Sequence, residues 1–455
     1  MDGVNVTSWL RLVVLVSILG LSLLAVGTAG AQTPSRPYRG LFGGAQPLSS
    51  RAPSLSLSLS GFGGWDQPTV ADPNTSPDDR VNVSGPYSGT TAGLDFTHPG
   101  ERLELQGSAY GFAGYFPDNS EKPWYTSSSA SGSVNYQVPL GQRSRLRFGE
   151  NARFATDLHL GVVGGTSGSI IPPAGGNAGF DNSLLRDPAI YSTSDVGYSY
   201  SFSRASSISA LYGYNFYHFF NADSERSDHR EQQAGITYNH AIGRYASLVL
   251  GYTYRHNLVP DTVEPPLAMH DINAGVNYSR ALSLTRNTKF SFHTGSTLTN
   301  SVNNVSQPTP ETRTHFFVVG GAELLREIGQ TWGAQVNYNR SVTYDAGFLQ
   351  PILRDEASAG IGGLIGRNVD VSSGVYYTVG AIGLETTNYH SWTASSQVRW
   401  AITRSLATYA SYYYYLYNFG SDVSLPSGVV QELHRNGVRV GLTTWLPLWT
   451  GRGAP

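Results

Sequence analysis

Most of the chain alternates between apolar and polar residues with a period of two. Leu55, Leu57 and Leu59 are separated by serines, and Leu248 and Leu250 begin a second run of this kind. Successive side chains of a β-strand point to opposite faces of a sheet, so this period is typical of strands. Beyond residue 31 no segment offers the apolar spacing of an amphipathic helix. The pattern therefore predicts an all-β protein.

The polar face of these segments stays rich in serine, asparagine, glycine and threonine along their full length. A β-sandwich would bury its apolar face between two sheets of short strands. Segments of about ten residues with one apolar and one polar face are instead typical of strands that cross a membrane. Lipid offers no hydrogen bonds to an open sheet edge. The sequence thus predicts a closed antiparallel transmembrane β-barrel.

The alternating segments number about eighteen, with about sixteen as the alternative count. Short connections, such as 139–142 and 203–205, alternate with long ones, such as 65–87 and 157–190. Barrels of the bacterial outer membrane have short periplasmic turns and long outer loops. An even number of strands places both ends of the barrel on the periplasmic side.

The first residues predict export from the cytoplasm. A positive charge at Arg11 precedes an apolar run from Leu12 to Val26, and Ala29-Gly30-Ala31 fits the small-x-small rule for cleavage. An uncleaved membrane anchor is the alternative. The predicted organisation is a signal peptide at 1–31, a flexible periplasmic arm at 32–52, the barrel at 53–449 and a short C-terminal tail at 450–455.

The composition excludes several classes of protein. Charged residues are 14% of the chain and the formal net charge is −2, which argues against a basic surface that binds nucleic acid. Cysteine is absent, so disulfides, cysteine-bound metals and a lipoprotein anchor are excluded. No motif for a metal or another cofactor is present, and none is predicted. With the signal peptide, these features predict the outer membrane of a Gram-negative bacterium.

The last strand carries a further signal. Val438, Val440 and Leu442 share one face of the segment that ends at Trp449. This segment resembles the C-terminal strand that the barrel-assembly machinery recognises. It departs from the usual form, in which an aromatic residue is last, because Thr450 to Pro455 follow.

Together with the serine-rich first strand and Gly-Arg turns such as Gly243-Arg244, this ending resembles outer-membrane porin-like proteins, including those associated with exopolysaccharide export. The resemblance implies a pore for solutes or for an exported polysaccharide. It also implies contact with outer-membrane lipid and lipopolysaccharide, and a periplasmic polysaccharide-export protein as a partner. The solute and the oligomeric state stay open.

Charged residues in the polar phase of the strands are predicted to line the lumen. Rings of charge bias which solutes enter a pore, whereas paired wall charges would give no selectivity, and both readings stay open. These residues are Arg102, Glu104, Arg145, Arg147, Arg153, Asp271, Lys289, His293, Arg313, His315, Arg399, Arg435 and Arg439.

Three local features carry predictions of their own. The connection 157–190 is expected either to fold inward and narrow the pore or to lie exposed on the surface. Glu150 falls in the apolar phase, which predicts a β-bulge that turns it inward, with a wrong phase as the alternative. Tyrosines near strand ends, including the run Tyr412–Tyr415, are expected to form aromatic girdles at the membrane surfaces.

The sequence leaves two alternatives to a pore. A barrel hydrolase would use histidine and aspartate at the outer rim, where His218, Asp223, Asp228 and His229 lie in or beside one loop. A solvated loop explains the same residues, so no catalytic residue and no enzyme activity are predicted. An adhesin or receptor would act through its outer loops.

Overall fold

All the regular structure described in the computed structural model is β-strand. The described residues are 53–70, 84–118, 123–156, 188–220, 228–258, 267–281, 288–303, 311–329, 331–343, 351–384, 388–421, 423, 425 and 431–450, so the predicted signal peptide and the predicted arm lie outside them. The strands are β1 (Ser54–Val70), β2 (Gly85–Pro99), β3 (Leu103–Tyr115), β4 (Trp124–Pro139), β5 (Ser144–Ala155), β6 (Ala189–Ser201), β7 (Ser206–Phe219), β8 (His229–Ala241), β9 (Ala246–Leu258), β10 (Leu267–Ala281), β11 (Thr288–Asn303), β12 (Glu311–Ile328), β13 (Trp332–Thr343), β14 (Ile352–Ile365), β15 (Val369–Ile382), β16 (Tyr389–Ala401), β17 (Leu406–Phe419) and β18 (Glu432–Thr450).

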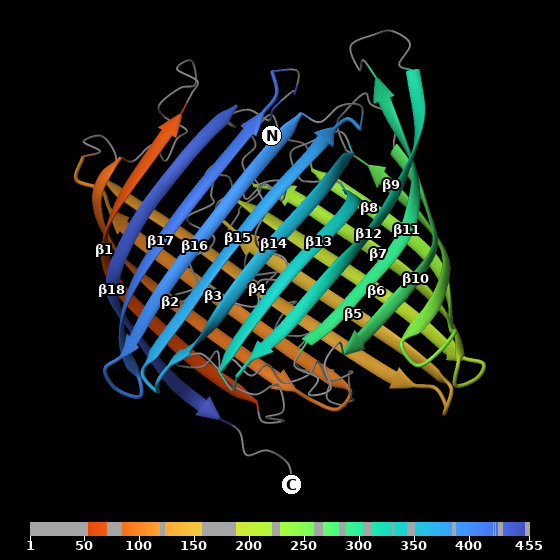
Figure 1. Cartoon of the computed structure of the whole chain (residues 1–455), viewed down its shortest axis with the longest axis horizontal. Coiled ribbons are helices and arrows are strands. Elements are labelled where there is room, and N and C mark those ends of the chain that lie inside the picture. The colour runs from red at the N-terminus through yellow and green to blue at the C-terminus, as the bar shows by residue number, and fades with distance from the viewer. Residues whose placement is uncertain are drawn as a thin grey trace, which may run out of the picture.

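The strands form one closed 18-stranded sheet in which chain neighbours pair in antiparallel fashion. Closure comes from β1, which pairs with β2 along one edge and with β18 along the other. Figure 1 shows the strands tilted around the ring, with the β11–β12 hairpin extending beyond the neighbouring strands at one rim. The predicted closed antiparallel barrel is confirmed. Among the described residues no helix is long and apolar enough to cross a membrane.

The two rims of the barrel differ in the length of their connections. Three residues join β2 to β3, whereas residues 156–188 separate β5 from β6 on the opposite rim. We call these rims the short-turn end and the long-loop end. At one short turn the Ser203 hydroxyl accepts hydrogen bonds from the backbone N–H groups of Ala205 and Ser206. At another, Gly366 has a φ of 66°, a left-handed conformation that glycine adopts at little cost.

A cluster of buried residues identifies the lumen face of the strands. Ala189 and Phe219 of β6 and β7 pack in one cluster with Ile352 and Tyr389 of β14 and β16. These strands lie on opposite sides of the ring, so their side chains meet only across the lumen. Residues directly opposite each other on paired strands share a face, and the register therefore extends this assignment from strand to strand.

The other face of the sheet is apolar and exposed. On β18, Val440 and Leu442 are 56% and 51% exposed, whereas the lumen-facing Arg439 and Thr443 are buried. The same alternation recurs on β16, where Trp392 and Trp400 lie on the outside. The outside of the ring is therefore the surface that water solvates least well.

Aromatic rings on the lumen face lie over glycines of the neighbouring strand. A Cβ atom on Gly437 would sit 2.3 Å from the ring of Tyr413, and one on Gly93 would sit 2.6 Å from the ring of Tyr110. The glycines thus provide the space that the rings occupy. The girdle prediction is wrong for half of Tyr412–Tyr415, because Tyr412 is outside while Tyr413 and Tyr415 are buried on the lumen face.

Glu150 lies on the outer face without a bulge. The pairing of β5 with β4 and β6 runs without a shift from Ser144 to Ala155, so the predicted bulge is wrong. The carboxylate instead accepts hydrogen bonds from the hydroxyls of Ser192, at 2.6 Å, and Ser194. Two hydroxyl donors on the adjacent strand satisfy the charge where it stands, because hydrogen bonds to ionised groups are among the stronger ones.

Polar side chains hold the seam between the first and last strands. Asp66 of β1 forms an ion pair with Arg435 of β18, and both side chains are almost fully buried. Farther along the seam, the Ser60 hydroxyl donates to the Thr443 hydroxyl at 2.9 Å. Removing one partner of a buried ion pair strongly lowers the stability of a protein, because the remaining charge loses its compensation.

We predict that Asp66→Ala destabilises the folded barrel by about 3–5 kcal/mol, because it removes the buried carboxylate that forms an ion pair with Arg435. The double variant Asp66→Leu/Arg435→Met removes both charges and is expected to recover most of the loss. The measurement is the temperature at which the barrel loses its compact migration on a detergent gel. An Asp66→Ala barrel as heat-stable as the native one would contradict this role.

Candidate functional site

The lumen narrows at the long-loop end, where apolar side chains from opposite walls pack together. All of them have less than a tenth of their surface exposed, which is unusual for residues that face the interior of a wide barrel. Val423 and Leu425 of the β17–β18 connection pack against them. We call this set the mouth cluster; its buried members are Ala189, Phe219, Ile352, Ile382, Tyr389, Tyr417 and Phe419.

The connection 157–190 was predicted as a possible constriction of the lumen. Residues 157–187 lie outside the described part of the chain, so neither reading of that loop is tested. The described residues that narrow the lumen come instead from strand ends and from the β17–β18 connection.

Arg435 and Arg439 face the lumen beside the seam but have little contact with water. Arg435 is held by Asp66. The Arg439 guanidinium lies 4.8 Å from the ring centre of Tyr413 and 5.2 Å from that of Phe62. Its Nε also donates to the Tyr87 hydroxyl at 2.5 Å. Cation–π and hydrogen-bond contacts therefore hold this cation in the wall.

Two further predicted charges are paired within the wall. Arg399 of β16 forms an ion pair with Asp370 of β15, whose side chain is almost fully buried. Asp271 of β10 forms an ion pair with Arg255 of β9 at 2.8 Å, and it accepts a hydrogen bond from Thr297. These pairs connect adjacent strands, so part of the predicted lumen charge is neutralised within the wall.

β5 carries three exposed cations on its lumen face. Arg145, Arg147 and Arg153 are all exposed and all lie on the lumen face of this strand. Arg147 contacts Asp195 of β6 at 3.1 Å, but more than half of its side chain stays exposed. Three cations beside one carboxylate make this wall locally positive.

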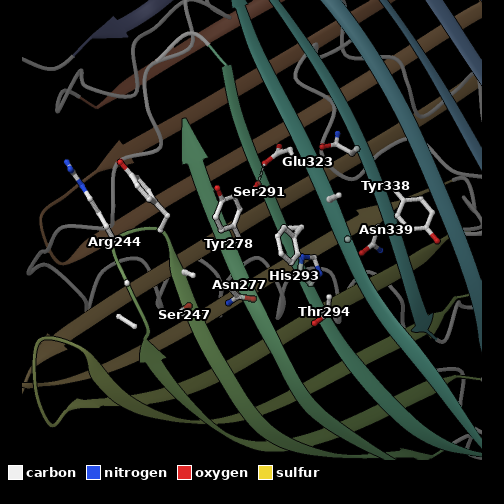
Figure 2. A pocket seen from close by; sticks show the side chains of 18 residues that line it. Arg244, Ser247, Asn277, Tyr278, Ser291, His293, Thr294, Glu323, Tyr338 and Asn339 are labelled. Carbon is white, nitrogen blue, oxygen red and sulfur yellow. Dashed lines mark hydrogen bonds between the residues drawn. The ribbon is translucent and has the colours of Figure 1, made fainter. Parts of the chain in front are cut away.

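A polar hollow of about 840 Å³ lies on the wall formed by β9 to β13, toward the short-turn end. Figure 2 shows its side chains on neighbouring strands, with the Ser291 hydroxyl donating to Glu323 at 3.4 Å. The predicted lumen residue His293 belongs to it, together with Asn277, Asn337 and Asn339. Gly321 leaves room between two of these side chains, since a Cβ there would lie 2.9 Å from His293 Cε1 and 3.3 Å from Asn339 Oδ1.

The remaining predicted residues are distributed along the barrel. Arg102 lies in the turn between β2 and β3, and Glu104 of β3 accepts a hydrogen bond from Gln106 at 2.7 Å. Lys289 lies at the short-turn end of β11, and the His315 ring stacks on Phe317 of β12. The side chain of Arg313 lies outside the described part of the structure.

The histidine and aspartate residues of the outer rim form a structural contact. His218 Nδ1 lies 2.7 Å from Asp228 Oδ2, while Asp228 Oδ1 accepts the backbone N–H of Phe219. The aspartate thereby ties together the two ends of the β7–β8 connection. Asp223 lies outside the described residues, and His229 lies on the other face of the sheet from His218. Within the described ranges no group of three histidine, aspartate or glutamate side chains is placed to hold a metal ion.

Several lumen residues carried no sequence prediction. Glu323 lies in the polar phase of its strand, so the rule that selected Glu104 also applies to it. Asp66 lies in the predicted connection 65–87, whereas the structure places it in β1. The mouth cluster had no such signal. Ala189, Ile352 and Phe419 lie in segments that were predicted to be connections, and Tyr389 and Tyr417 lie in the phase that was expected to be polar.

No family model and no curated protein matches this sequence. Solved structures do resemble the barrel. They include OpdL of Pseudomonas aeruginosa, with 13% identity, a TM-score of 0.39 and coverage of 87% of this chain and 99% of that one. OccK2 (OpdF) of the same organism, solved in complex with glucuronate, has 11% identity, a TM-score of 0.40 and coverage of 87% and 98%. OmpT of Vibrio cholerae, expressed in the outer membrane, has 13% identity, a TM-score of 0.33 and coverage of 88% and 99%. The likeness is one of general barrel architecture.

Proposed function

We propose that this protein is an outer-membrane channel for hydrophilic solutes. The observation that carries the proposal is a closed ring of 18 strands with an apolar exterior and a lumen wall that includes exposed arginines and a polar hollow. A ring of this size is wide enough to enclose a water-filled path. Its exterior suits hydrocarbon, since each strand pairs with a neighbour on both sides and the ring has no open edge.

The mouth cluster acts as the gate of this channel. Apolar side chains that meet across a lumen exclude water and ions, and hydrophobic constrictions close other pores in this way. The cluster is formed by strand ends, and Val423 and Leu425 of the β17–β18 connection pack against it. The channel is therefore closed at its long-loop end until the cluster separates.

The finer part of the proposal concerns the solute and the partners. A saccharide polymer suits a lumen that carries many hydroxyl and amide groups, because these groups both donate and accept hydrogen bonds. In this view the polymer leaves a periplasmic export protein at the short-turn end. The barrel-assembly machinery inserts the barrel through its C-terminal strand, and lipopolysaccharide surrounds its outer rim.

Conductance across a planar lipid bilayer tests the channel itself. We expect the purified full barrel to give discrete current steps, with long closed periods set by the mouth cluster. Liposomes that contain the barrel should also swell in iso-osmotic solutions of small neutral sugars. Absence of current and of swelling, both for the native barrel and for the gate variant described next, would overturn the proposal.

We predict that Phe219→Ala/Phe419→Ala opens the channel. Truncating one buried phenylalanine removes about 3–5 kcal/mol of packing, and ~1.4 kcal/mol changes an equilibrium tenfold. The open fraction in single-channel records should therefore rise roughly tenfold or more. Phe148→Ala, which removes an exposed ring from the outer face, is the matched control. An equal rise in the control would show that the effect does not arise at the mouth.

We predict that Arg145→Gln/Arg153→Gln reduces the preference of the channel for anions. A unit charge about 10 Å from a passing ion changes its energy in water by ~0.4 kcal/mol, which corresponds to about a twofold change per arginine. The measurement is the reversal potential in a potassium chloride gradient. Arg230→Gln, on the outer face of β8, should leave that potential unchanged. A potential that does not move in the double variant would assign selectivity to another wall.

A further inference from the structure

The polar hollow on β9 to β13 differs in its chemistry from the wall beside Arg435 and Arg439. On the seam side the lumen-facing cations are buried against aromatic rings or carboxylates. The hollow instead leaves open a volume of about 840 Å³, which lies within the range of roughly 300–1,000 Å³ typical of sites for small ligands. It faces the same lumen through which the proposed solute passes.

Neutral hydrogen-bonding groups dominate the lining. Asn277, Asn337 and Asn339 each carry two donor hydrogens and an acceptor oxygen, and Ser291 adds a hydroxyl. Two of these amides each make one hydrogen bond to a serine of the wall. Asn337 Nδ2 donates to Ser358 and Asn339 Nδ2 donates to Ser341, both at 3.3 Å. The amide oxygens and the second amide hydrogens therefore remain available to a ligand.

The lining of the hollow includes one charged residue of each sign. Glu323 lies inside the hollow and Arg244 lies at its rim. Vicinal hydroxyl groups require a donor and an acceptor within a short distance, and a carboxylate or an amide beside a second amide provides both. The lining therefore matches a polyhydroxylated, uncharged ligand.

We propose that this hollow is a binding site for an uncharged saccharide, with Asn337, Asn339 and Glu323 as its hydrogen-bonding groups. The inference rests on the proposed channel function and adds a substrate class to it. The hollow lies near the short-turn end and the mouth cluster at the opposite end, so a saccharide meets the site before it reaches the gate.

Isothermal titration calorimetry on the folded full barrel tests the site independently of conduction. The probes are maltotriose and triacetylchitotriose, which are uncharged, and trigalacturonate, which carries three carboxylates. We expect at least one uncharged probe to bind at least tenfold more tightly than trigalacturonate. The double variant Asn337→Leu/Asn339→Leu should weaken that binding at least tenfold.

The matched control is Asn135→Leu/Asn151→Leu, which makes the same replacements on the lumen faces of β4 and β5. Compact migration on a detergent gel shows that each variant has folded. Failure of both uncharged probes to bind, equal binding of trigalacturonate, or equal loss in the control would overturn the site. If the barrel conducts ions but binds no probe, the channel stands without the site; if it binds but neither conducts nor swells liposomes, the channel falls.

Discussion

Closure of the sheet is the constraint on which the rest of the structure depends. A strand at an open edge presents unpaired N–H and C=O groups, which hydrocarbon cannot satisfy. Here β1 pairs along its length with β18, and the buried Asp66–Arg435 pair and the Ser60–Thr443 hydrogen bond reinforce that seam. In a closed ring, successive side chains of each strand point alternately to the outer face and to the lumen face. The outer side chains must suit an apolar environment, and the lumen side chains must fit together inside the barrel.

The interior is divided into regions with different chemistry. Beside the seam, rings such as Tyr413 lie over glycines and enclose Arg439, so that part of the wall is packed rather than open. β5 presents exposed arginines, and the wall from β9 to β13 contains the polar hollow. The mouth cluster joins opposite walls at one end. A solute in the proposed channel therefore passes a hydrogen-bonding site and a positive wall before an apolar gate.

Pairing across strands explains why charge on the sequence is a poor guide to charge in the lumen. Arg399, Arg435 and Asp271 lie in the polar phase, as expected, yet each is neutralised by a residue on an adjacent strand. Glu150 gives the converse case. It stays on the apolar face because two serine hydroxyls of β6 satisfy it. In both cases the deciding partner is distant in sequence and becomes a neighbour only through the register.

The sequence by itself determined the all-β class, the approximate number of strands and, for most strands, the residues that share a face. These follow from a period of two, which is a local property of the backbone. Only the tertiary structure decided that Tyr413 and Tyr415 turn inward, that Arg439 is enclosed by rings, and that Phe219 meets Phe419 in one cluster. Those contacts join opposite walls or the two ends of the chain, and alternation along a single strand carries no information about what lies across a closed ring.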